Sequence, residues 1–79
     1  MNTVMLDFRV DGNELIVEYD QRTEKCLWSI FNLGGIELRN GLLKGDAPHH
    51  ISLERLSPDI YHLCIIDGDQ LVNSKFRIR

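Results

Sequence analysis

The chain has no long hydrophobic run, no block of like charge and only two cysteines. Because no stretch of about 18 apolar residues occurs, no transmembrane helix is expected. The 9 basic and 12 acidic residues are spread along the sequence and leave a net charge of −3. A basic face of the kind that binds nucleic acid or anionic membranes is therefore missing. The sequence predicts neither a nucleic-acid partner nor membrane insertion.

Motifs for catalysis or cofactor binding are also absent. No serine lies in a nucleophile elbow, and no glycine-rich loop precedes a helix to hold phosphate. His49 and His50 are adjacent, so on a strand they point to opposite faces and are poorly placed to bind one metal ion; we interpret them as surface or loop residues, and His62 likewise. Asp67-Gly68-Asp69 lacks the other ligands of a calcium loop and is predicted to be a hairpin turn. We expect no enzyme, no cofactor, no metal site and no small-molecule substrate.

The N-terminal residues contain no basic segment ahead of their apolar stretch, so they do not form a secretory signal. If Met1 is the true start, the protein is expected in the cytoplasm. If the chain is an excised C-terminal domain, it is expected outside the cell or on the cell surface. The sequence leaves both localisations open.

Alternation of apolar and polar residues dominates the chain and is typical of strands. It is clear from Val4 to Val10, from Leu15 to Tyr19 and from Ile60 to Ile66, and Asp11-Gly12-Asn13 forms a strong turn signal. Gly41 to Pro48 is expected to be a loop. With about seven short strands and no linker, residues 1–79 are predicted to form one domain, a small Ig-like or fibronectin-III-like antiparallel β-sandwich.

The two cysteines are predicted to remain free thiols. Cys26 alternates in phase with Trp28 on the expected core face, whereas Cys64 is out of phase with Leu63, which is also expected in the core. If their strands are neighbours in one sheet, the thiols point to opposite faces and cannot be bridged. A β-bulge that shifts the register is the alternative, and it would allow pairing.

The same parity places an apolar set on the outer side of that sheet. Its members are Leu27, Phe31, Leu33, Cys64 and Ile66. A monomeric sandwich normally has polar residues there, and a contiguous exposed apolar patch usually marks an association surface. We predict an interface with a protein partner or with a second copy in a homodimer. In the alternative, a loop or the N-terminal strand covers the face, or Leu33 turns away at Gly34-Gly35.

Four segments between Leu15 and Arg79 also resemble, in order, the strands of a known family. They are Trp28-Ser29-Ile30-Phe31-Asn32-Leu33-Gly34-Gly35, Ile51-Ser52-Leu53-Glu54-Arg55-Leu56, Ile60-Tyr61-His62-Leu63 and Lys75-Phe76-Arg77-Ile78-Arg79. The family is the C-terminal sorting domain of the type IX secretion system, an Ig-like β-sandwich at the ends of secreted proteins in Bacteroidetes. Asp59 stands where the family has a glycine, and its usual Asn-Pro opening is missing. The resemblance implies a non-enzymatic interaction module that an export machine reads, here stand-alone or excised.

Two other functions remain open from the residues. One is a small intracellular structural or regulatory β-sandwich whose similarity to the family is convergent. The other is a carbohydrate-binding accessory domain, which needs aromatic rings that face solvent. Tyr19, Trp28 and Tyr61 are all predicted to face inward, and this disfavours sugar binding.

Overall fold

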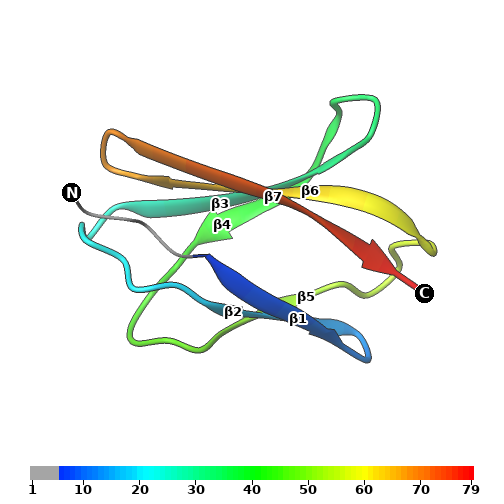
Figure 1. Ribbon diagram of the computed structural model, residues 1–79, viewed down its shortest axis with the longest axis horizontal. Coiled ribbons are helices and arrows are strands. Elements are labelled where there is room, and N and C mark those ends of the chain that lie inside the picture. Colours follow the sequence, from blue (N-terminus) through cyan, green and yellow to red (C-terminus); the bar gives the residue numbers. More distant parts are fainter. Residues whose placement is uncertain (1–5) are drawn as a thin grey trace.

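The computed structural model describes residues 6–79, which form seven strands and no helix. The strands are β1 (Asp7–Asp11), β2 (Glu14–Glu18), β3 (Cys26–Asn32), β4 (Glu37–Leu42), β5 (His49–Ser52), β6 (Asp59–Asp67) and β7 (Gln70–Ile78). They build two antiparallel sheets with the orders β1-β2-β5 and β4-β3-β6-β7, stacked as two layers (Figure 1). The predicted all-β architecture of about seven strands is therefore confirmed, and it is consistent with a small β-sandwich.

The position of β4 distinguishes the two sheets. In the constant-type immunoglobulin sandwich the fourth strand belongs to the sheet of the first two strands. Here β4 pairs with β3, so the second sheet has four strands and the first has three. The larger sheet consequently has a broad outer face, which carries the candidate site.

Alternation in the sequence explains how the first sheet forms its inner face. In β2, Leu15 and Val17 are fully buried while Glu14 and Glu18 are exposed. The turn before β2 requires a left-handed residue, and Gly12 provides it with a φ of 58°. The N-terminal part of the first predicted strand, at Val4, lies outside the described residues.

The hydrophobic core lies between the two layers and draws on both. Its buried members are Leu15, Val17, Tyr19, Cys26, Ile30, Leu43, Ile51, Leu53, Tyr61, Leu63, Ile65 and Phe76. Phe76 organises the aromatic part of this core, because its ring stacks on Tyr61 with centroids 5.7 Å apart. Phe8 from the first sheet packs edge-on against Phe76 with centroids 6.3 Å apart. Such pairs hold the two layers in register through shape as well as through buried area.

The loop expected from Gly41 to Pro48 begins later than predicted. Strand β4 continues through Gly41 to Leu42, and Gly41 is the register partner of Trp28 in β3. A Cβ atom at Gly41 would lie 2.8 Å from Nε1 of Trp28. Gly41 therefore leaves room for the indole to lie across β4, and the glycine is a strand residue with a packing role.

Arg39 joins β4 to the opposite sheet. A register shift between Ile30 and Phe31 interrupts the β3–β4 ladder, and Arg39 is the partner of Ile30 on the inner side. Its guanidinium donates to the carbonyl oxygen of Ser52 at 3.1 Å and to that of Glu54. Backbone carbonyl oxygens at and just after the end of β5 thus accept hydrogen bonds from a side chain of β4, the edge strand of the other sheet.

Candidate interaction surface

Four large aliphatic residues form a straight row across the outer face of the four-stranded sheet. In register from β4 to β7, they are Leu42, Leu27, Ile66 and Leu71. Their exposed fractions are 48%, 45%, 40% and 61%. Each strand contributes one side chain at the same level, so no polar residue separates them along the row. We call these four residues the aliphatic row.

Two further rows follow along the strands on the same face. The middle row is polar and consists of Asn40, Ser29, Cys64 and Asn73, in the order β4-β3-β6-β7. The third, or charged, row consists of Glu37, Phe31, His62 and Lys75 in the same order. The register shift between Ile30 and Phe31 leaves Leu38, which is 40% exposed, beside Glu37 without a partner in the β3–β4 ladder. The charged row has its acid on the β4 edge and its base on the β7 edge.

The structure divides the predicted interface between these rows. Leu27 and Ile66 are direct register partners in the aliphatic row. Phe31 and Cys64 are only partly exposed, whereas Leu33 is 56% exposed. These last three residues lie together, because they line one hollow of about 390 Å³ with His62 and Asn73 among its other walls. The predicted residues therefore do share one face, in two groups.

The turn between β3 and β4 gives this hollow its outer wall. Asn32 fixes the turn, because its side-chain oxygen accepts a 2.9 Å hydrogen bond from the backbone N–H of Ile36. Its carbonyl oxygen also accepts a 3.0 Å hydrogen bond from the N–H of Gly35. The turn rises away from the three-stranded sheet, on the side of the outer face (Figure 1). Leu33 belongs to this turn, yet it still lines the hollow.

Sequence reasoning missed Leu42 and Leu71. The sequence predicts a loop from Gly41 that includes Leu42, and it places Leu71 on neither face of its strand. Parity counted back from Phe76 along the closing strand would have placed Leu71 on the outer face, because the two residues are an odd number of positions apart. The loop predicted from Gly41 onward excluded Leu42 from the strand, although β4 includes it and pairs it with Leu27.

The outer face of the three-stranded sheet has a different character. Its Ile16 lies between the register partners Arg9 and His50 and is 4% exposed. Beside it, Nδ1 of His50 lies 3.4 Å from Oε1 of Glu14. In the row Arg9, Ile16 and His50, polar side chains thus lie on both sides of the single aliphatic residue. The exposed aliphatic row is a property of one face of the sandwich.

Asp67 is a polar centre that the sequence did not reveal. It was predicted as a turn residue and it does begin the β6–β7 turn, but its side chain is buried. The carboxylate accepts hydrogen bonds from the Tyr19 hydroxyl (2.8 Å), the Arg22 N–H (2.7 Å), and the Thr23 N–H (2.9 Å) and hydroxyl (2.6 Å). Burial alone would raise the pKa of Asp67, but these hydrogen bonds outweigh it and lower the pKa to about 2. The site fixes the chain that leads from β2 to β3.

Both cysteines are free, as predicted. Cys26 is fully buried and Cys64 is partly exposed. In the β3–β6 ladder Cys26 is opposite Asp67, whereas Cys64 is opposite Ser29, so the thiols lie on opposite faces of the sheet. Burial, with a smaller contribution from the charge of Asp67, raises the pKa of Cys26 to about 11, and burial also raises the pKa of Cys64. Neither thiol has the environment of a reactive cysteine.

The histidines do not form a metal site in the described part of the chain, residues 6–79. As expected, His49 and His50 lie on opposite faces of β5, one buried and one exposed. The interpretation of His49 as a surface residue was wrong, because His49 is 7% exposed. Within residues 6–79 its Nε2 atom has no hydrogen-bond partner. His49 lines a hollow of about 240 Å³, with Trp28 and Ile51 among its other walls.

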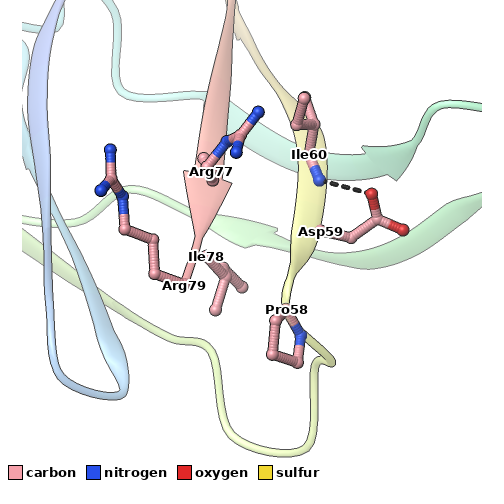
Figure 2. Close-up of a pocket in the computed structure, with 6 residues that line it drawn as sticks. All are labelled: Pro58, Asp59, Ile60, Arg77, Ile78 and Arg79. Carbon is pink, nitrogen blue, oxygen red and sulfur yellow. Dashed lines mark hydrogen bonds between the residues drawn. The ribbon is translucent and has the colours of Figure 1, made fainter.

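A second surface hollow, of about 410 Å³, lies where β6 begins and β7 ends. Figure 2 shows that the guanidinium groups of Arg77 and Arg79 point in different directions there. The carboxylate of Asp59 faces its own backbone, because it accepts a 2.7 Å hydrogen bond from the N–H of Ile60. The charged groups do not converge on a common point. This hollow is therefore a weaker candidate for a binding site than the outer face of the four-stranded sheet.

The aromatic residues that sugar binding would need face inward, as predicted. Tyr19 and Tyr61 are 1% and 4% exposed, and Trp28 packs against the core over Gly41. None of these rings forms a platform on the surface. In residues 6–79 no helix has the length and apolar character to cross a membrane.

Comparison with protein-family models and with curated proteins finds no match to this chain. The resemblance to type IX sorting domains therefore stays a prediction made from the quoted segments.

Proposed function

We propose that the protein is a non-enzymatic protein-interaction module that binds through the outer face of its four-stranded sheet. The observation that carries the proposal is the aliphatic row, in which Leu42, Leu27, Ile66 and Leu71 are all at least 40% exposed and directly in register. Antiparallel sheets usually present polar residues to water on their outer face. A contiguous apolar row in that position favours a surface that a partner covers.

Energetics support a binding role for this row. Each fully buried leucine or isoleucine side chain contributes about 2 kcal/mol relative to an exposed one. Within the sandwich the row contributes only part of that free energy, because 40–61% of each residue remains exposed. A partner that covers the row would recover the rest. Association also costs entropy, which offsets part of the free energy gained by burying the row. The affinity therefore depends on the shape and charge around the row as much as on its area.

Site-specific photo-crosslinking in the native cells tests this proposal. A benzophenone amino acid replaces Leu71 in the row, and a matched control replaces Glu18, an exposed residue of the other sheet. We expect crosslinked products from position 71 and none from position 18. Equal labelling from both positions, or no product from position 71, would refute binding through this face.

A narrower form of the proposal is that the module is a sorting domain of the type IX secretion system. Its support is the order of the four resembling segments, which lie in β3, β5, β6 and β7 and the turns beside them. A reporter fused to the chain's N-terminus, behind a signal peptide, should be exported by a type IX-competent bacterium. Export should stop when residues 75–79 are deleted, and retention of the intact fusion would count against this narrower function.

A further inference from the structure

We infer that the partner is a second copy of this chain, packed face to face about a twofold axis that runs parallel to the strands between β3 and β6. The inference rests on the proposed function, because it uses the same outer face. The evidence is the self-complementary order of residues in three successive rows.

The symmetry determines which strands meet. A twofold axis that lies in the interface and parallels the strands keeps each row at its own level and reverses the order of the strands. The order β4-β3-β6-β7 of one copy then faces β7-β6-β3-β4 of the other. Each edge strand meets the opposite edge strand, and each central strand meets the other central strand. Face-to-face sheets commonly pack in this aligned way, with strands about 30° apart.

The aliphatic row matches itself under this operation. Leu42 faces Leu71 of the second copy, and Leu27 faces Ile66 of the second copy. Each pair occurs twice, so eight exposed aliphatic side chains meet at one level. No charged group is brought against them, and burial of a charge without a partner is avoided.

The polar row matches itself as well. Asn40 faces Asn73 of the second copy, and Ser29 faces Cys64 of the second copy. Carboxamide groups both donate and accept hydrogen bonds, so two asparagines can pair directly. The row therefore brings hydrogen-bonding groups together rather than isolating them against apolar surface.

The charged row gives the strongest support, because it has opposite charges at its two ends. Glu37 on β4 faces Lys75 on β7 of the second copy, and Phe31 faces His62 between them. Glu37 begins β4, directly after the turn that follows β3. Two Glu–Lys pairs therefore border the dimer, one on each side of the axis.

An axis perpendicular to the strands fits much less well. It would reverse the order of the rows and keep β4 over β4 of the second copy. If all three rows overlap, the aliphatic row then faces the charged row, so that Leu42 lies over Glu37 and Leu71 over Lys75 of the second copy. The charge order thus selects the parallel axis.

The size of the face predicts a weak dimer. Four strands spaced about 4.8 Å apart, and three rows that span about 14 Å, give a face of about 400 Å² once side-chain borders are included. Stable interfaces bury about 800 Å² on each partner. We therefore expect a weak, reversible dimer that forms only at high chain concentration.

Charge reversal tests both the partner and the axis. Glu37→Lys makes both ends of the charged row basic, and Lys75→Glu makes both ends acidic. In sedimentation equilibrium, at concentrations up to about 1 mM, each single variant should dimerise at least about fivefold more weakly than the wild type. The double variant should recover wild-type affinity. An equimolar mixture of the two single variants should form a heterodimer of at least wild-type affinity, because each acid then meets a base.

Glu18→Lys supplies the control, because it makes the same charge change on the other sheet and should leave the dissociation constant unchanged. A wild-type chain that stays monomeric at about 1 mM would overturn the inference, as would a mixture that fails to heterodimerise. The crosslinking experiment separates this failure from failure of the proposed function. Products of twice the chain mass from position 71 support the second copy. Products of another mass exclude it but leave the interaction module intact.

Discussion

The hydroxyl of Tyr19 donates a 2.8 Å hydrogen bond to Oδ2 of Asp67, and both residues are buried. Tyr19 directly follows β2 in the three-stranded sheet, whereas Asp67 ends β6 in the four-stranded sheet. This contact joins the two layers at one end of the core. Burial, with help from the hydrogen bond to Asp67, raises the pKa of Tyr19 to about 12, so the phenol remains a donor across the physiological pH range.

Replacement of Asp67 by asparagine should destabilise the protein in a pH-dependent way. The carboxylate accepts four hydrogen bonds, and loss of its charge is expected to cost about 2 kcal/mol of unfolding free energy at pH 7. Because the pKa of Asp67 is lowered from 3.8 to about 2, its contribution is complete above pH 4 and disappears as the pH falls toward 2. Urea denaturation at several pH values measures both effects.

The matched control for this change is Asp69→Asn, because Asp69 lies in the same turn but is exposed. Its stability should equal that of the wild type at pH 7. The difference between wild type and Asp67→Asn should shrink between pH 4 and pH 2. A difference that stays constant across this range would show that the carboxylate charge is not what holds the chain before β3.

Alternation of apolar residues was sufficient to predict the strands, since most of them have one buried and one open face; β2 is an exception, because Ile16 on its outer side is also buried. It was insufficient for Asp67, because its partners Tyr19 and Thr23 are 48 and 44 positions away in the sequence. A turn signal describes local geometry and cannot show that a side chain bends back to receive distant donors. The same limit applied to Gly41, which was interpreted as a loop residue although its role is to make room for Trp28.

The candidate surface was predictable only in part for the same reason. Parity placed Leu27 and Ile66 on the outer face, and the structure pairs them directly. That Leu42 and Leu71 extend the row depends on which strands occupy the sheet edges. Sheet order is set by contacts between distant segments, and one sequence without such contacts leaves it open.

Replacement of Gly41 by alanine tests the packing of Trp28. The added Cβ would lie 2.8 Å from Nε1 and 2.9 Å from Cε2 of the indole, so the ring or β4 must move. We expect a loss of about 1–3 kcal/mol of unfolding free energy, as for other overpacked sites. Chemical denaturation measures the loss, and tryptophan fluorescence reports the displaced ring.

A double-mutant cycle identifies the cause of that loss. Gly41→Ala should cost much less in a Trp28→Leu background, because the indole that the methyl group meets is gone. The nearby exposed variant Asn40→Ala should be close to neutral in both backgrounds. An equal cost of Gly41→Ala with and without Trp28 would refute the steric explanation.

Arg39→Lys should weaken the link between β4 and the end of β5. The guanidinium donates to the carbonyl oxygens of Ser52 and Glu54, and a single ammonium group on a flexible stem cannot reproduce that planar fork. We expect a loss of about 1 kcal/mol of unfolding free energy, at most what two exposed hydrogen bonds provide. Arg9→Lys, at an exposed position of β1, should cost nothing measurable. Equal stabilities of the two variants would show that the Arg39 contacts do not hold β5.

The two thiols should differ in their rates of reaction with a disulfide reagent. Cys26 is fully buried and its pKa is raised to about 11, so at pH 8 it should react only when the protein unfolds. Cys64 is partly exposed on the outer face, but burial raises its pKa as well, so it should react more slowly than a free cysteine. Absorbance of the released thiolate, followed with and without denaturant, resolves the two phases. In Cys64→Ser the phase seen without denaturant should vanish. The remaining Cys26 thiol should react with the reagent only at the rate at which the protein unfolds. A fast phase that persists in this variant would contradict the placement of Cys26 in the core.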